Sequence, residues 1–251
     1  MALTIYPKEK QAYGQFDAGA ILENKPIGFP HEGGELRPYS NLFYWAHAWS
    51  DNGGLIGEHP HQGFEIMSFV LKGEIEHYDN QLGAWKKLQA GDAQIIRSGN
   101  GISHAEKFLP GSHIFQVWVD PNLQKTLKKS ASYNDYRSDS FPVHQEDNMT
   151  IKTFRGEGAP MQMDAEEIEI KQLELNVGEH VFNLNPDRVY SYYLIEGQLE
   201  IGDQYLRADD FFLVKDLNIQ RLQVTEKSVL FLIETSALAP YTTYAMMQGL
   251  S

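Results

Sequence analysis

The sequence contains no cysteine among its 251 residues. This absence excludes disulfide bonds, thiolate metal ligands and cysteine nucleophiles, so any metal would have to be bound by imidazole nitrogens and by oxygen donors. It is also compatible with a reducing cytoplasm, where disulfides are rare. The chemistry of this chain therefore has to reside in other side chains.

Basic residues are few as well. Lysine and arginine total 21 against 34 aspartates and glutamates, and the net charge is −13. Nucleic acids and anionic membranes attract basic surfaces, so we expect neither as a direct partner. No stretch approaches the roughly 18 consecutive apolar residues of a membrane span, and the first eight residues, MALTIYPK, lack the apolar core of a signal peptide. The sequence predicts a cytoplasmic location.

Aromatic residues, by contrast, are abundant. The chain has 13 Phe, 13 Tyr and 4 Trp, and aromatic residues are enriched in β-strands. Short apolar or alternating segments are separated by glycine-containing turns, which predicts an all-β barrel or sandwich. We expect strands at residues 41–50, 66–71, 74–78 and 93–96, and only short helices, at 124–130 and 240–250.

Two pairs of polar residues stand at strand spacing. His59 and His61 enclose one proline, and His104 and Glu106 enclose one alanine. Residues two apart on a strand point to the same face, so the members of each pair would project together. If the two strands lie side by side, three imidazoles and a carboxylate share one pocket and can bind a divalent transition metal. The alternative is that they are ordinary polar groups of a β-protein.

The segments around these pairs resemble the pirin family of the cupin superfamily. The resemblance is carried by residues 59–65 (HPHQGFE), 71–77 (LKGEIEH), 91–94 (GDAQ), 101–106 (GISHAE) and 115–121 (FQVWVDP). It implies two tandem cupin barrels, that is, double-stranded β-helices or jelly rolls, with one mononuclear metal in the first. The implied metal ligands are His59, His61, His104 and Glu106. Gln62 stands where an arginine is expected, which leaves the substrate open.

The second half of the chain repeats the first. Residues 71–76 (LKGEIE) are echoed by 195–200 (IEGQLE), and residues 88–93 (LQAGDA) by 206–211 (LRADDF). In this alignment, the four candidate ligands correspond in order to Asn183, Asn185, Leu222 and Val224. We therefore expect an N-terminal metal-binding cupin domain at residues 1–135 and a C-terminal degenerate cupin domain without metal at residues 136–251.

The number of ligands guides the choice of metal. Four protein ligands would complete the tetrahedron that zinc prefers, whereas an octahedral ion keeps two positions for substrate or dioxygen. The set resembles the two-histidine, one-carboxylate platform of non-haem Fe(II) oxygenases with one added imidazole. Fe(II) is our first choice for a single divalent ion per chain. Nickel, copper, manganese and zinc remain alternatives, because affinity alone does not select iron.

Residues near the candidate ligands have less certain roles. Glu65 would either orient a ligating histidine through its second ring nitrogen or form structural hydrogen bonds. The apolar residues Phe64, Met67 and Phe69 are candidates for lining the pocket, with core packing as the alternative. His77 is expected at the surface or at the rim of the pocket.

The resemblance implies a dioxygenase of the quercetin 2,3-dioxygenase type, acting on a flavonol with dioxygen. A bound metal would lower the pKa of the flavonol 3-hydroxyl, and Glu106 would act as the catalytic base that takes its proton. The main alternative is a non-enzymatic regulatory protein that binds a protein partner in a metal-dependent way. A further alternative is a cupin that acts on a sugar or small acid, because one fold hosts many activities.

Overall fold

The computed structural model describes residues 2–250, and its secondary structure confirms the all-β prediction. Within this range there are twenty strands and two four-residue α-helices, α1 (Leu123–Thr126) and α2 (Tyr244–Met247). Helix α2 falls inside its predicted segment and α1 begins one residue before its own, and both are shorter than predicted. No helix in the described range is long and apolar enough to cross a membrane.

The chain divides into two compact units. The N-terminal unit comprises Gln11–Ser140, Gln162–Glu166 and the chain from Pro240 onward. The C-terminal unit comprises Phe141–Met161, Glu167–Ala239 and the chain up to Lys10. These units differ from the expected division at residues 1–135 and 136–251, because each end of the chain belongs to the unit built mainly from the other half.

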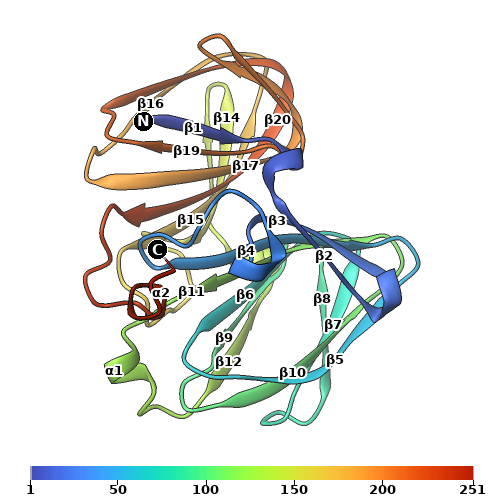
Figure 1. The fold of residues 1–251 in the computed structure, drawn as a ribbon. Helices are drawn as coiled ribbons and strands as arrows, with labels where there is room; N and C mark the ends of the chain where they lie inside the picture. The colour runs from blue at the N-terminus through green and yellow to red at the C-terminus, as the bar shows by residue number, and fades with distance from the viewer. Residues whose placement is uncertain (1, 251) are drawn as a thin grey trace. The chain divides into compact units, whose positions relative to one another are not determined.

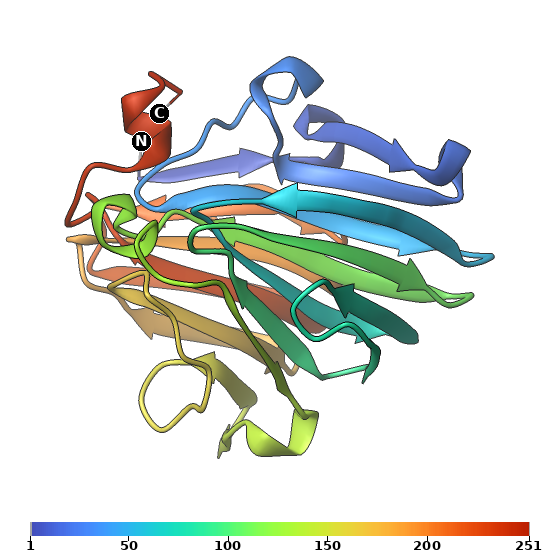
Figure 2. The same cartoon turned by 90° about the horizontal axis from the view of Figure 1, so that it is seen from below.

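Strand pairing and apolar contacts account for this exchange of ends. Strand β1 (Leu3–Tyr6) satisfies its backbone groups by pairing with β19 (Phe211–Lys215) in the C-terminal unit. Helix α2 packs Ala245 and Tyr244 against Phe43 in the N-terminal unit. Figure 2 shows this helix, in red, outside the layered strands. Composition and local patterns do not reveal such long-range contacts, so the exchange of chain ends was not predicted.

The N-terminal unit consists of two antiparallel sheets (Figure 1). One has the strand order β12-β9-β6-β11-β4-β3-β2 and the other has the order β5-β10-β7-β8. The strands are β2 (Ala12–Phe16), β3 (Ile21–Ile27), β4 (Leu42–Ser50), β5 (Gly54–His61), β6 (Glu65–Lys72), β7 (Glu74–Asp79), β8 (Trp85–Gln89), β9 (Ala93–Arg97), β10 (Ile102–Phe108), β11 (Ser112–Val119) and β12 (Ser132–Tyr136).

An apolar core fills one end of this barrel. Its buried members come from both sheets: Ile21, Ala48, Ile56, Val70, Ile75, Leu88, Phe108 and Ile114. Strands β5 and β10 are antiparallel, so Ile56 and Phe108 lie toward the same end of the pair. The opposite end carries His61 and Ile102, which are paired. The core thus occupies one end of the barrel and leaves the histidine-bearing end for other chemistry.

The C-terminal unit is built on one nine-stranded sheet. Its order is β1-β19-β17-β20-β15-β14-β13, with β16 paired to β20 and β18 to β17. The remaining strands are β13 (Val143–Glu146), β14 (Met149–Arg155), β15 (Ile168–Leu175), β16 (Gly178–Asn183), β17 (Arg188–Ile201), β18 (Gln204–Arg207) and β20 (Ile219–Ser236). A cluster of buried apolar side chains, including Leu199, Leu222 and Leu230, lies in its interior.

The structure confirms the internal repeat at a pair of glycines. Gly73 and Gly197 occupy matching turns and have positive φ angles of 73° and 88°. A Cβ atom would lie 2.7 Å from the Oγ of Ser112 at the first and 2.4 Å from the Oγ of Ser228 at the second. Only glycine accepts both the backbone conformation and this close approach.

Candidate metal centre

Three histidines converge at the polar end of the N-terminal barrel. His59 and His61 lie on β5, and His104 lies opposite His59 on the neighbouring strand β10. The Nε2 atom of His104 is 3.0 Å from Nε2 of His61 and 3.1 Å from Nε2 of His59. The strand spacing therefore directs three ring nitrogens at one point, in agreement with the predicted shared pocket.

The surroundings orient the His59 ring and favour the neutral forms of His61 and His104. Nδ1 of His59 lies 2.8 Å from the carbonyl oxygen of Gly57, which can only accept, so the proton sits on Nδ1 and the Nε2 lone pair faces the other rings. Burial, followed by the charge of His59, lowers the pKa of His61 to about 4. Burial and the neighbouring histidines hold the pKa of His104 far below its ordinary value. Neutral imidazole is the form that binds metals.

Glu106 lies beside the three histidines and is completely buried. Ser68 Oγ donates a hydrogen bond of 2.8 Å to one carboxylate oxygen, and the Gln116 side-chain amide donates to the other. Trp118 Nε1 in turn donates to Gln116 Oε1 at 3.1 Å. Ser68 and Gln116 are paired on β6 and β11, so the carboxylate of Glu106 links the two sheets.

These side chains fall into two overlapping groups that could bind a metal. The first is His59, His61 and His104, and the second is His77, His104 and Glu106. Within each group the ligand atoms lie within 4.8 Å of one another. The donor set of imidazoles and one carboxylate, in a chain without thiols, fits a divalent transition metal. The structure thus brings three predicted ligands together and places Glu106 next to them through the shared His104.

His77 corrects an expectation. It is not at the surface or the rim but fully buried, opposite Glu106 on the neighbouring strand β7. Gln94 hydrogen-bonds its Nδ1 at 3.0 Å, and its ring stacks on Tyr133 with the ring centres 4.8 Å apart. Burial lowers the pKa of His77. His77 lies two residues after the buried Ile75 and so shares its face of β7. This spacing could have predicted from the sequence that His77 is buried.

A cavity of about 210 Å³ adjoins His59, His61 and Glu106. The residues that line it are Phe16, Lys25, Phe29, Glu32, Tyr44, Ile56, His59, His61, Glu106, Gln116 and Trp118. Most are aromatic side chains or members of the candidate centre. The cavity is smaller than the roughly 300–1,000 Å³ of pockets that bury a whole drug-sized ligand, so it suits one part of an aromatic molecule.

The apolar residues predicted to line this cavity lie elsewhere. Ser68 points to Glu106, so its strand neighbours Met67 and Phe69 face away from the centre. Phe64 packs between Phe43 and Tyr244, with ring centres 4.5 and 5.4 Å away. None of the three lines the cavity, and all of them follow the core-packing alternative.

Glu65 also follows its structural alternative. Its two carboxylate oxygens accept hydrogen bonds of 2.7 Å from the backbone N–H groups of Asp164 and Ala165. It is 1% exposed, and burial raises its pKa to about 7. Both oxygens therefore hold the segment at residues 162–166 in place, and neither orients a candidate metal ligand.

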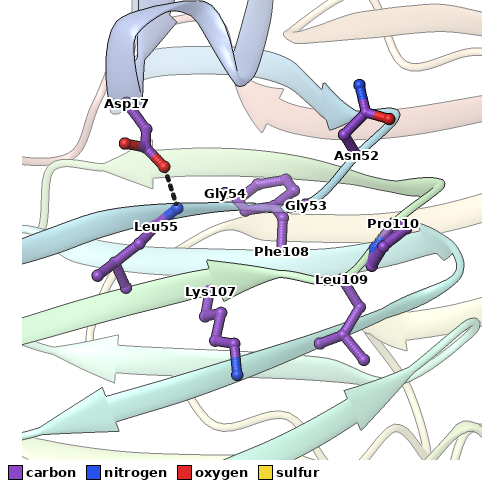
Figure 3. Close-up of a pocket in the computed structure, with 9 residues that line it drawn as sticks. All are labelled: Asp17, Asn52, Gly53, Gly54, Leu55, Lys107, Phe108, Leu109 and Pro110. Atoms are coloured by element: carbon purple, nitrogen blue, oxygen red, sulfur yellow. Dashed lines mark hydrogen bonds between the residues drawn. The ribbon is translucent and has the colours of Figure 1, made fainter.

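A second hollow, of about 370 Å³, lies at the opposite end of β5 and β10 (Figure 3). Its charged lining residues are Asp17 and Lys107, and the close-up shows their side chains directed apart. The Asp17 carboxylate accepts from the backbone N–H of Leu55 at 3.0 Å, and Lys107 pairs with Glu76 at 2.9 Å. Both charges serve local structure, so this hollow offers no converging chemistry.

Sequence reasoning missed Ser68, Gln116 and Lys25 at the site. Ser68 and Gln116 each have apolar neighbours on both sides in their strands, whereas Lys25 follows Glu23 and Asn24 on β3. Gln116 and Lys25 line the cavity, and Ser68 donates a hydrogen bond to Glu106. A buried polar group needs a hydrogen-bonding partner. For Ser68 and Gln116, an isolated polar residue in an apolar run was thus the available signal, and for Lys25 it was the polar run at residues 23–25 within a buried strand.

Strand pairing in the C-terminal unit corrects the expected correspondence of ligands. His180, not Asn183, lies opposite Leu222 on β16 and β20, as His59 lies opposite His104. The equivalent of His61 is then Phe182. Loop lengths differ between the halves, so the alignment by sequence slipped by three residues on β16. Leu222 and Val224 keep the positions assigned to them.

Comparison with known proteins shows the family of this chain. The family model described as Pirin matches residues 39–119. A pirin-like protein of Caulobacter vibrioides is 30% identical over 188 residues, which cover 71% of this chain and 76% of that one. The chain belongs to the pirin family. A Pasteurella multocida protein, provisionally named a quercetin 2,3-dioxygenase, is 27% identical over 185 residues, covering 70% of this chain and 74% of that one.

Solved structures establish the bicupin fold of this pirin-family chain. A quercetin 2,3-dioxygenase from Acinetobacter baumannii superposes with a TM-score of 0.79 at 20% identity, covering 93% of this chain and 79% of that chain. A bacterial pirin from Escherichia coli in complex with nickel(II) gives 0.77 at 19% identity, covering 94% and 100%. The prediction of tandem cupin barrels is confirmed.

Proposed function

We propose that this pirin-family chain is a mononuclear metal dioxygenase that acts on a flavonol such as quercetin. The observation that carries the proposal is the convergence of three imidazoles beside an aromatic cavity, with Nε2 of His104 3.0 Å from that of His61 and 3.1 Å from that of His59. His59, His61, His104 and Glu106 would hold one divalent ion. The C-terminal unit would hold none, because its equivalent positions are largely apolar.

The spacing of the nitrogens supports an octahedral ion. Two metal–nitrogen bonds of about 2.1 Å separate their nitrogens by about 3.0 Å at a right angle and by about 3.4 Å at the tetrahedral angle. The Nε2 pairs at 3.0 and 3.1 Å match the right angle. An octahedral ion such as Fe(II) would leave positions for substrate and dioxygen that tetrahedral zinc lacks.

A bound ion would act as a Lewis acid that lowers the pKa of the flavonol 3-hydroxyl. Glu106 is the base within reach, and Ser68 and Gln116 hold its carboxylate in a fixed position for that proton. Trp118 packs edge-on against His61 with ring centres 4.8 Å apart, so it holds that ring and presents an apolar surface to a flat substrate. The reaction consumes one dioxygen and releases carbon monoxide, so it needs no external reductant.

The cavity favours turnover of a small molecule over the regulatory alternative. Binding a protein partner uses an exposed surface, whereas Glu106, which lines the aromatic cavity, is 0% exposed. Aromatic walls with a few converging polar groups are typical of small-molecule sites. The relatives named as quercetin dioxygenases support the same choice.

The test is anaerobic loading with Fe(II), Ni(II), Co(II) or Cu(II), followed by mixing with quercetin in air. We expect loss of flavonol absorbance and release of one carbon monoxide per flavonol consumed, with at least one of these metals. The variant Glu106→Gln should keep the fold and lose most of kcat. Rates equal to those of free metal with every ion would overturn the proposal.

A further inference from the structure

One wall of the cavity contains a buried lysine that no step above uses. Lys25 lies on β3 with its side chain 2% exposed. Its Nζ is 2.9 Å from an oxygen of Glu23 and 2.6 Å from an oxygen of Glu32. Lysine is almost never this buried unless it is paired, and desolvating three charges is costly. Because this burial is costly and the cluster lies at the edge of a cavity, we looked for a role in ligand binding.

Neighbouring residues hold the three charged groups of this cluster in place. A Cβ atom on Gly14 would lie 2.4 Å from the Lys25 ammonium, so glycine on β2 leaves room for it. The second oxygen of Glu32 accepts from the backbone N–H of Phe29 at 2.8 Å. Tyr44 donates its hydroxyl to Glu23 at 3.1 Å, and the ammonium lies 5.6 Å from the centre of the Tyr44 ring. These contacts fix the ammonium and both carboxylates.

Two members of the cluster face the cavity with opposite hydrogen-bonding character. Lys25 and Glu32 both line it. An ammonium only donates and a carboxylate only accepts, so the pair matches a group that accepts at one atom and donates at the next. Two adjacent hydroxyls on one ring have this property. One ammonium with two carboxylates leaves the wall negative, which disfavours a substrate carboxylate.

Aromatic side chains flank the same wall. Phe29 packs against Tyr44 and Trp118, with ring centres 5.1 and 5.6 Å away, and all three line the cavity. A flat ring inserted between them would be held by its faces and edges. The wall therefore suits an aromatic ring that carries its polar groups at the far edge.

We propose that Lys25 and Glu32 recognise a catechol, that is, two neighbouring hydroxyls on an aromatic ring of the substrate. This inference rests on the proposed function and deepens it, because it selects among flavonols and disfavours small organic acids. Lys25 donates to one hydroxyl and Glu32 accepts from the other. The pair acts as a specificity determinant and takes no part in holding the metal.

The test compares quercetin with galangin, which has the same 3-hydroxyl and carbonyl but no hydroxyls on its pendant ring. Binding is measured anaerobically by calorimetry on the Ni(II)-loaded protein, so that no turnover intervenes. We expect quercetin to bind about tenfold more tightly than galangin, the size of effect of hydrogen bonds to charged groups. Lys25→Met should abolish this ratio while leaving galangin affinity and metal content unchanged.

Two further variants keep the test decisive if Lys25→Met does not fold. Gly14→Ala retains every charge but displaces the ammonium, and should reduce the ratio. Lys128→Met, at an exposed lysine, is the matched control and should leave it at about tenfold. Equal binding of both flavonols, or a ratio that persists in Lys25→Met and Gly14→Ala, overturns the inference alone. Binding of neither flavonol overturns the proposed function itself.

Discussion

The two barrels have equivalent strand pairs around the candidate site and different side chains in their interiors. In the N-terminal unit His104 on β10 lies opposite His59 on β5, and in the C-terminal unit Leu222 on β20 lies opposite His180 on β16. One histidine thus persists at an equivalent position. His180 is hydrogen-bonded to the carbonyl oxygen of Asn176 at 2.8 Å, which gives it a local structural role.

The polar residues that hydrogen-bond Glu106 in the first barrel are also replaced in the second. Ser68 and Gln116 are paired on β6 and β11, and the equivalent pair on β17 and β20 is Tyr192 and Leu232. Tyr192 stacks on Phe212 with ring centres 4.7 Å apart. Large apolar side chains therefore fill the space that polar donors occupy in the first barrel. The comparison shows that the barrel can form either with a cluster of candidate metal ligands or with an apolar interior.

The largest effect is expected when an imidazole of the first barrel is removed. His61→Ala should lower the bound metal from about one ion per chain to near zero, because loss of one of a few ligands destroys a mononuclear site. His180→Ala, the matched change in the second barrel, should leave the metal content unchanged. Mass spectrometry of protein purified without chelator measures both. Equal loss in the two variants would break the distinction between the barrels.

A second prediction installs the missing ligands in the C-terminal unit. Phe182→His combined with Leu222→His would place three imidazoles where the first barrel has His59, His61 and His104. We expect a second ion to bind, more weakly than the first, because Val224 supplies no carboxylate. Buried Leu222 contributes to the core, so stability should fall by about 2–4 kcal/mol. Titration calorimetry that detects one site only would show that backbone equivalence is insufficient.

A third prediction concerns stability apart from metal. Counting back eight residues from the equivalent glycines Gly73 and Gly197, Glu65 corresponds to Val189. Glu65→Ala leaves the backbone N–H groups of Asp164 and Ala165 without their acceptor, and should cost about 2–4 kcal/mol. Val189→Ala should cost about 1 kcal/mol. Denaturant unfolding measures both, and metal content should remain unchanged in each.

The smallest expected effect is the pH dependence that Glu65 contributes. Its pKa is raised from 4.5 to about 7 in the folded protein, so between these values the folded state binds more protons than the unfolded state. Its contribution is therefore full below pH 4.5 and is lost as pH rises through 7. The stability of the wild type relative to Glu65→Gln should fall from pH 4.5 to 7. A constant difference across this range would contradict the raised pKa.

Several features were predictable because they depend on local periodicity. Residues two apart on a strand share a face, which was enough to pair His59 with His61 and His104 with Glu106. The repeat around Gly73 and Gly197 was visible because a turn with positive φ requires glycine.

Other features depend on partners distant in sequence. The donors Ser68 and Gln116 approach Glu106 only because two sheets face each other. The Lys25 cluster requires Gly14 on the adjacent strand, and the exchange of chain ends requires pairing across some 200 residues. No local pattern encodes these distances.

The most direct measurement is an anomalous-difference map from crystals of the Fe(II)-loaded protein, collected at the iron edge. The account predicts one peak per chain, within bonding distance of His59, His61, His104 and Glu106, and none in the C-terminal barrel. A peak beside His180, or none at the three histidines, would contradict it.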